Sequence, residues 1–127
     1  MSANLDLIRS TYEIGPSVLL PALAPDVEWT EAAGFPYAGT YRGVDAIVKS
    51  VFARLGSEWE GFKPNLQDLY DAGETIIGTG FYEGTYRATN RPMRASFAHV
   101  FTLKDGKIVR FVQYVDSRKV WEAIEAK

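Results

Sequence analysis

The sequence predicts an α+β fold in which a strongly curved antiparallel sheet packs on N-terminal helices and a short helix ends the chain. Two patterns support this prediction. Apolar residues recur at helical spacing in the first part of the chain, and they alternate with a period of two in the second part, between short turn segments. Helices followed by hairpins are typical of helices gathered on one face of an antiparallel sheet. Such a sheet, curved over helices, makes a cone with a closed end and an open mouth.

Three helices are expected before the main run of strands. The first extends from Asn4, as its N-cap, to Ile14, and Gly15-Pro16 ends it. The second uses Pro16 as its first position and stops before Pro25. The clearest helix covers Val44 to Leu55, because its apolar residues form one broad stripe and Gly56 follows as a stop signal.

An aromatic loop separates the second helix from the third. Val27–Glu31 has the residue types of a strand, and the segment from 32 to 43 is rich in glycine and proline. Phe35, Tyr37 and Tyr41 lie in this segment, where a simple linker would carry polar residues. We therefore expect the loop to cover part of a pocket.

Four strands and one helix are expected in the rest of the chain. The strands are joined by short segments such as Asp105-Gly106, which favour tight turns. Apolar residues return to helical spacing only in the last segment of the chain. The expected strands are Phe62–Tyr70, Thr75–Ala88, Met93–Leu103 and Ile108–Val115, and the expected helix is Arg118–Ala126.

The composition limits the classes of function. A length of 127 residues with 46% hydrophobic residues is enough for one core, so residues 1–127 are expected to form one domain. The net charge of −2 comes from 14 basic and 16 acidic side chains mixed along the chain, so nucleic acid is not an expected partner. The chain has no cysteine and begins without the pattern of a signal peptide, which favours a cytoplasmic protein. No apolar run approaches the roughly 20 residues that span a membrane.

The single histidine lies on the inward face of a predicted strand. Alternation along this strand places Phe97, His99 and Phe101 on one face, which the aromatic residues mark as interior. The other face is semi-apolar and is not expected to be covered by the helices. It suggests a homodimer formed sheet against sheet. This outer face carries Ser96, Ala98, Val100 and Thr102.

The expected hairpin brings a carboxylate onto the same face. With a two-residue turn, Phe97 pairs with Tyr114 and Ala95 with Asp116, so that His99, Tyr114 and Asp116 share one face. The rows of His99 and Asp116 are then about 13 Å apart along the strand, a gap that a ligand or a water chain could bridge. A bulge would change both the distance and the face.

These residue types suggest acid/base chemistry in a pocket. A histidine and a carboxylate at a site of low dielectric are the usual general acid/base pair, and Tyr114 could donate a hydrogen bond to a developing oxyanion. Asp116 and His99 could each have a purely structural role instead. Asp116 could instead be the N-cap of the last helix, and His99 could be a buried imidazole bonded to a tyrosine hydroxyl or a backbone carbonyl. One histidine is also a poor basis for a metal site.

Short motifs in the second half of the chain resemble a known family. They are 97–101 (Phe-Ala-His-Val-Phe), 104–108 (Lys-Asp-Gly-Lys-Ile) and 113–116 (Gln-Tyr-Val-Asp), and 41–43 (Tyr-Arg-Gly) precedes the main helix. Their joint spacing resembles the SnoaL-like branch of the nuclear-transport-factor-2-like (NTF2-like) superfamily over nearly the whole chain. The resemblance implies a cone-shaped fold, a homodimer, and a pocket in which an aspartate acts as acid/base without a cofactor. Asp116 matches that aspartate, and His99 matches a pocket histidine.

Ketosteroid isomerases of the same superfamily carry their base near the end of the first strand. The segment Val27-Glu28-Trp29 is similar to that region, and Trp29 stands where their carboxylate would be. Tryptophan cannot move a proton in that way, so an isomerase mechanism would require Glu31 to take over from a shifted position.

The sequence therefore predicts a protein that binds a small hydrophobic organic molecule. It could be a cofactor-free enzyme of polyketide-cyclase or isomerase type, with Asp116 and His99 as catalytic residues. The alternative is a non-catalytic ligand-binding or dimerisation module, because one fold supports both. The residues expected to contact the ligand are Trp29, Tyr37, Tyr41, Phe97, Phe101 and Tyr114.

Overall fold

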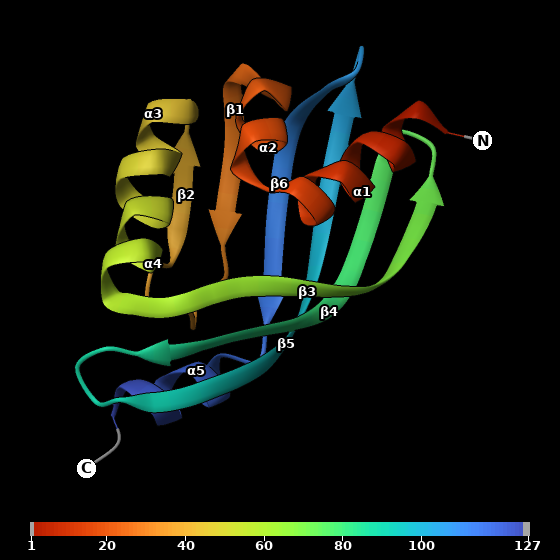
Figure 1. Ribbon diagram of the computed structural model, residues 1–127. Helices are drawn as coiled ribbons and strands as arrows, with labels where there is room; N and C mark the ends of the chain where they lie inside the picture. Colours follow the sequence, from red (N-terminus) through yellow and green to blue (C-terminus); the bar gives the residue numbers. More distant parts are fainter. Residues whose placement is uncertain (1, 126–127) are drawn as a thin grey trace.

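The computed structural model of the chain describes residues 2–125. Figure 1 shows a sheet with α1 and α2 against one face, with β3 bending across that face and α5 beside β5. Ala126, where the last expected helix would end, lies outside the described residues. The elements are α1 (Ala3–Ile14), α2 (Pro16–Ala22), β1 (Leu23–Glu31), β2 (Gly39–Arg42), α3 (Val44–Ile47), a π-helical turn η1 (Val48–Phe52), α4 (Ala53–Glu58), β3 (Trp59–Ala72), β4 (Thr75–Tyr86), β5 (Arg91–Lys104), β6 (Lys107–Val115) and α5 (Ser117–Ile124).

The sheet has six strands in the order β2-β1-β6-β5-β4-β3. The antiparallel meander expected from β3 to β6 is confirmed. The strand β1 lies beside β6 and runs parallel to it, so the sheet is mixed. Local turn signals could not indicate this pairing, because the two strands are joined only through the whole intervening chain. The short strand β2 forms within the segment expected to be a loop, by pairing with β1.

Two helix ends differ from the expectation. Ser2, and not Asn4, caps α1, since the Ser2 hydroxyl accepts a hydrogen bond of 3.0 Å from the Leu5 amide. The main helix continues through α3, η1 and α4 beyond Gly56. A glycine that ends a helix adopts a positive φ, and Gly56 does not. The helix ends instead where Trp59 becomes extended and buried as the first residue of β3.

The hairpin between β5 and β6 sets which residues face the interior. Its two-residue turn is confirmed, because Asp105 and Gly106 both have positive φ, as a type I′ turn requires. The register then shifts, with Leu103 opposite Ile108 but Thr102 opposite Arg110. The residue between them on β6, Val109, is a β-bulge. Every later residue of β6 consequently turns to the opposite face from the one expected.

The side chains of the core form two clusters. One packs β1, β5 and β6 against α1, α2 and α3, and includes Trp29 and Phe101. The other packs the far ends of β4 and β5 against α5, and includes Tyr82 and Phe97. Tyr12 of α1 packs against both clusters, which places the middle of α1 over the junction between them.

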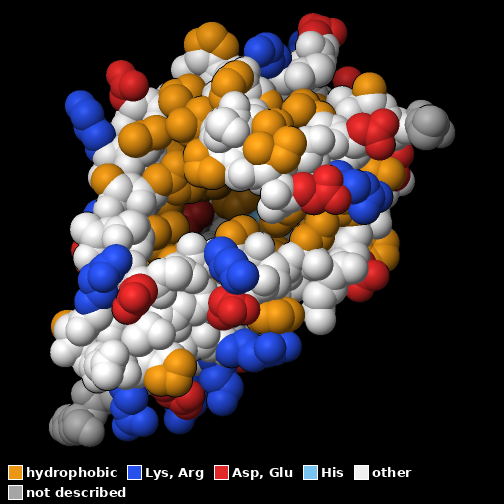
Figure 2. All heavy atoms as spheres, viewed as in Figure 1, with side chains coloured by type: hydrophobic (Ala, Val, Ile, Leu, Met, Phe, Trp, Pro, Cys, Tyr) orange, Lys and Arg blue, Asp and Glu red, His pale blue; other side chains and the backbone are white. Residues whose placement is uncertain are grey.

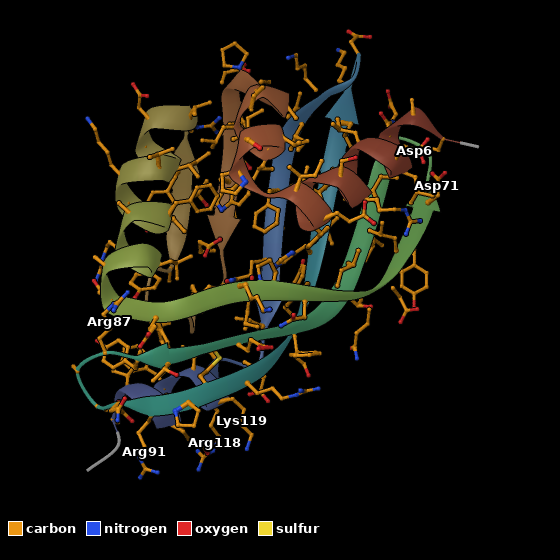
Figure 3. All side chains as sticks on the ribbon, in the orientation of Figure 1. Asp6, Asp71, Arg87, Arg91, Arg118 and Lys119 are labelled. Atoms are coloured by element: carbon orange, nitrogen blue, oxygen red, sulfur yellow. The ribbon has the colours of Figure 1, made fainter. Side chains whose placement is uncertain are left out.

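Most charged side chains lie on the outside of the fold. In Figure 3, Arg91, Arg118 and Lys119 lie around β5 and α5, whereas Asp6 and Asp71 lie at the other end, near the N-terminus. Glu122 forms ion pairs with Arg118 and Lys119. None of the described helices is long and apolar enough to cross a membrane. The outer sheet face carries Tyr114, which is 58% exposed, and the homodimer expected through this face stays a prediction.

Candidate functional site

A cavity of about 600 Å³ opens between α1, the helix formed by η1 and α4, and the bent strand β3. Figure 2 shows it as a hollow surrounded by hydrophobic side chains. The exposed residues Glu13 and Lys63 lie at its rim, whereas the walls are mainly aromatic. The volume and the apolar walls are typical of sites for small organic molecules. The aromatic residues include Tyr12, Trp29, Phe35, Phe62, Phe101 and Phe111.

Glu31 is the one carboxyl group buried in the wall of this cavity, among the described residues. Alternation along β1 turns Val27, Trp29 and Glu31 to the interior, and Glu31 is only 4% exposed. Trp29 Nε1 donates a hydrogen bond of 2.8 Å to Glu31 Oε2. Glu31 Oε1 has no hydrogen-bond partner among the described residues. Every fully buried side-chain oxygen of these residues has a partner, so Oε1 is not fully buried. Oε1 is therefore the oxygen available to a ligand.

The environment of Glu31 favours its neutral form. Burial raises the pKa of Glu31 to about 7, and the hydrogen bond from Trp29 opposes this shift. Near neutral pH the group therefore exists in both protonation states. A carboxyl with such a pKa can accept a proton and return it, which is the requirement for a general acid/base.

The raised pKa of Glu31 predicts a pH-dependent stability. Between pH 4.5 and 7 the folded protein holds a proton on Glu31 that the unfolded chain releases, so stability falls as pH rises through this window. The fall amounts to about 3 kcal/mol for this group. The Glu31→Gln variant should therefore be more stable than the wild type at pH 8 by up to about 3 kcal/mol, with a smaller difference at pH 5. Urea unfolding at both pH values measures this, and Glu60→Gln, an exposed carboxyl on β3, is the control. Equal differences at both pH values would contradict the prediction.

A buried chain of hydrogen bonds crosses the floor of the cavity. The two ring nitrogens of His99 each lie close to a tyrosine hydroxyl, with Nδ1 2.6 Å from Tyr12 Oη and Nε2 2.5 Å from Tyr82 Oη. Gln113 Nε2 donates to Tyr82 Oη over 2.8 Å, and Gln113 Oε1 accepts from the Ala32 amide over 3.0 Å. The chain thus connects Ala32, directly after β1, with β6, β4, β5 and α1.

His99 stays uncharged in this environment. It is 5% exposed, and burial lowers its pKa to about 3. Its ring stacks on Phe97, with centroids 4.0 Å apart. The alternative of a buried imidazole bonded to tyrosine hydroxyls is therefore the arrangement that the structure shows. A neutral imidazole held on both sides orients its neighbours and is poorly suited to take up a proton at neutral pH.

The structure places some of the residues expected at the site in the cavity wall and others outside it. His99, Trp29 and Phe101 line the cavity, and Trp29 stacks on Phe111 with centroids 3.8 Å apart. Phe97 lies behind His99 and is not part of the lining. Tyr37 and Tyr41 are held outside the cavity: the Tyr37 hydroxyl donates to Glu58, and the Tyr41 hydroxyl donates to the Tyr37 carbonyl.

The expectation that His99, Tyr114 and Asp116 share a face is wrong. The bulge at Val109 places Gln113 opposite His99 and turns Tyr114 outward. The Asp116 amide donates to the backbone carbonyl of Ser96, and the Asp116 carboxyl is exposed outside the cavity lining. Asp116 occupies the N-cap position of α5, but its side chain accepts no capping hydrogen bond from the described residues.

Sequence reasoning missed Tyr12, Tyr82 and Gln113 as site residues. Tyr12 lies within the first expected helix, where the sequence does not mark it as a site residue, and Gln113 faces the site only because of the bulge. Glu31 was considered only as a substitute for Trp29. The signal for Glu31 was present, because a charged residue on the inward row of an apolar strand indicates a site.

Residues 2–125 contain no group of three histidine, aspartate or glutamate side chains placed to hold a metal ion. The site is thus a cavity with aromatic walls, one buried carboxyl and one chain of neutral hydrogen-bonding groups. Together with the cone-shaped α+β fold, it places the chain in the class of NTF2-like domains with an interior cavity.

Comparison with known proteins gives the family. The model of the SnoaL-like domain family matches residues 15–111, and the chain belongs to this family. An NTF2-like protein from Burkholderia thailandensis E264 is 43% identical, with 98% of this chain and 99% of that chain covered and a TM-score of 0.91. No curated protein sequence matches the chain significantly.

Two more distant structures share the fold. TerC, co-crystallised with polyporic acid, is 24% identical, with 98% of this chain and 100% of that chain covered and a TM-score of 0.83. A protein from Jannaschia sp. CCS1 assigned as a SnoaL-like polyketide cyclase is 14% identical. The match covers 98% of this chain and 93% of that chain, with a TM-score of 0.83. At these identities the likeness extends to the fold alone.

Proposed function

We propose that the protein binds a small hydrophobic carbonyl compound in the cavity and moves a proton on it with Glu31, without a cofactor. The observation that carries this proposal is a buried carboxyl with one unpaired oxygen in the wall of an aromatic cavity of about 600 Å³. Desolvating a carboxyl is costly, and a carboxyl buried in a mainly aromatic wall indicates a chemical role.

The lining of the cavity supports the choice of ligand. Aromatic side chains bury a hydrophobic body, and a few polar groups fix its orientation. The charged residues Glu13 and Lys63 lie only at the rim, so the interior favours an uncharged molecule. The distant structural relatives, one co-crystallised with polyporic acid and one assigned as a polyketide cyclase, are consistent with an organic ligand of this kind.

The proposed chemistry is a reversible proton transfer next to a carbonyl group. The Glu31 carboxylate takes a proton from the carbon beside the carbonyl, and the electron pair of the broken C–H bond moves to the carbonyl oxygen to give an enolate. Return of the proton to the same or another carbon restores a ketone. This step is common to isomerisation and to aldol cyclisation, and it requires a base with a pKa near the working pH.

Deuterium exchange tests this function. The protein in D₂O with 1-tetralone, a bicyclic ketone, is expected to accelerate deuterium incorporation beside the carbonyl, as followed by proton NMR. The rate should rise with pH through about 7, because only ionised Glu31 is a base. Binding of 1-tetralone without accelerated exchange would favour the alternative, a non-catalytic ligand-binding protein.

The same assay distinguishes the two candidate carboxyls. Asp116 is exposed and lies outside the cavity lining, so the Asp116→Asn variant should exchange deuterium at the wild-type rate. Loss of exchange in Asp116→Asn, with the fold intact by circular dichroism, would instead return the acid/base role to Asp116, as the family resemblance implies.

A further inference from the structure

The direction of the hydrogen bonds in the buried chain can be deduced from its far end. The Ala32 amide can only donate, so the Gln113 atom that it contacts at 3.0 Å must be the side-chain oxygen. The other atom of that amide group, Nε2, is therefore a donor, and it lies 2.8 Å from Tyr82 Oη. The orientation of Gln113 is thus fixed by its neighbours.

The orientation of Gln113 determines which way the hydrogen bond between Tyr82 and His99 runs. Two groups lie within hydrogen-bond distance of Tyr82 Oη among the described residues: Gln113 Nε2, which cannot accept a hydrogen bond, and His99 Nε2 at 2.5 Å. Among residues 2–125, the hydrogen of the Tyr82 hydroxyl consequently has an acceptor only if His99 Nε2 accepts it. The opposite arrangement would leave a buried hydroxyl hydrogen without an acceptor, at a cost of about 1–3 kcal/mol.

We propose that this chain holds His99 as the Nδ1–H tautomer and thereby makes the Tyr12 hydroxyl a hydrogen-bond donor toward an oxygen of the bound ligand. A neutral imidazole carries one hydrogen, so acceptance at Nε2 places that hydrogen on Nδ1, which donates to Tyr12 Oη over 2.6 Å. The Tyr12 hydroxyl hydrogen then has no acceptor among residues 2–125, and Tyr12 lines the cavity.

His99 then has a different role from the expected one of an acid/base. Tyr12 is the group that contacts the ligand, and His99, Tyr82 and Gln113 are positioning residues that fix the direction of its hydrogen. Burial raises the pKa of the Tyr12 hydroxyl, so this group keeps its proton at neutral pH. It suits a ligand with a carbonyl oxygen that gains negative charge during reaction. The ligand part of this inference rests on the proposed function, whereas the tautomer of His99 does not.

Gly78 leaves the space that Tyr12 occupies. Gly78 pairs with His99 across β4 and β5, and a Cβ atom at this position would lie 2.8 Å from Tyr12 Oη. A side chain at residue 78 would push the hydroxyl away from His99 Nδ1. The absence of a side chain at Gly78 therefore has a part in building the site.

The first experiment determines the tautomer of His99 in the free protein. The chain has a single histidine, so untagged ¹⁵N-labelled protein gives one imidazole in a long-range proton–nitrogen correlation spectrum, with no assignment needed. The expected result at pH 7 is a protonated Nδ1 and an unprotonated Nε2. A protonated Nε2 would overturn the proposal, because Tyr12 would then have to donate to His99.

The second experiment compares two ligands of the same shape. They are 1-tetralone and 1-methylenetetralin, in which a CH₂ group replaces the carbonyl oxygen, and binding is followed by chemical-shift titration. The wild type should bind the ketone roughly 2- to 10-fold more tightly than the alkene, the value of one net hydrogen bond. The Tyr12→Phe variant should bind both ligands equally. Tyr70→Phe, an exposed tyrosine on β3, is the matched control and should keep the preference for the ketone.

The outcomes separate the inference from the proposed function. A preference for the ketone that persists in Tyr12→Phe would overturn the role of Tyr12 as donor even if the cavity binds both ligands. Failure of both ligands to bind to the wild type would contradict the proposed function and the ligand contact together. The His99 tautomer would still decide the direction of the buried chain.

Discussion

Replacing Glu31 by glutamine is expected to slow the deuterium exchange of 1-tetralone by a factor of about 10² to 10⁴, the usual contribution of a positioned general base. Glutamine has the same shape as glutamate, and its side-chain oxygen can still accept the hydrogen bond from Trp29 Nε1. It cannot take up a proton at neutral pH. The cavity should therefore keep its form and its affinity for the ketone while the rate of exchange falls.

The exchange rate and the affinity for 1-tetralone are both measured on the Glu31→Gln variant. Exchange is followed by proton NMR in D₂O, and binding by chemical-shift titration at a pH below the titration of Glu31. Lost exchange with unchanged affinity would identify Glu31 as the base. Exchange at the wild-type rate in Glu31→Gln would contradict the proposal directly, since no other carboxyl among the described residues is buried in the cavity wall.

The expected loss of rate and the expected gain in stability have the same origin. The wild type keeps a carboxyl in an aromatic wall, where burial opposes its ionisation. Its ionised form, which is the base, is the form that destabilises the fold. A variant that is more stable at pH 8 and nearly inactive would show that the site retains an unfavourable group for its chemistry.

Local sequence patterns were sufficient for the main elements and for part of the site. The alternation in β5 correctly placed His99 and Phe101 inside, because side chains of a strand with one buried face follow a strict period of two. The same rule applied to β1 places Trp29 and Glu31 on the interior face. These residues were predictable because their orientation depends only on their own strand.

The remaining site residues depend on features that the sequence does not mark. The bulge at Val109 exchanges the faces of Gln113 and Tyr114, and nothing in the residue types around it distinguishes a bulge from a regular pair. The expected positions of Tyr114 and Asp116 were wrong for this reason. Tyr12 reaches His99 only because α1 crosses the sheet, a contact between residues 87 positions apart.

The Gly80→Ala variant is expected to lose about 3 kcal/mol or more of folding stability, the range of severe overpacking. A Cβ atom at residue 80 would lie 1.9 Å from the backbone oxygen of Asn65 on β3. The obstacle is main chain within a paired strand, so it cannot move aside as a flexible side chain could. We expect a much lower midpoint in thermal or urea unfolding, or failure to accumulate folded protein.

Two further glycines provide a graded comparison. A Cβ atom at Gly84 would lie 3.0 Å from Phe62 Cα, so Gly84→Ala should be intermediate, whereas Gly56 in α4 has open space and should tolerate alanine or gain about 1 kcal/mol. A Gly80→Ala midpoint equal to that of Gly56→Ala would show that β3 does not approach β4 so closely.

The close approach at Gly80 also connects the stability of the sheet to the site. Register shifts on both sides of Asn65 bend β3 where it passes Gly80, and this bend carries Phe62 and Asn65 over the mouth of the cavity. Only a residue without a side chain lets the two backbones meet there. A folded fraction of Gly80→Ala should therefore have a wider mouth and bind 1-tetralone more weakly, although residue 80 does not line the cavity. Full affinity in such a fraction would mean that the bend of β3 does not shape the site.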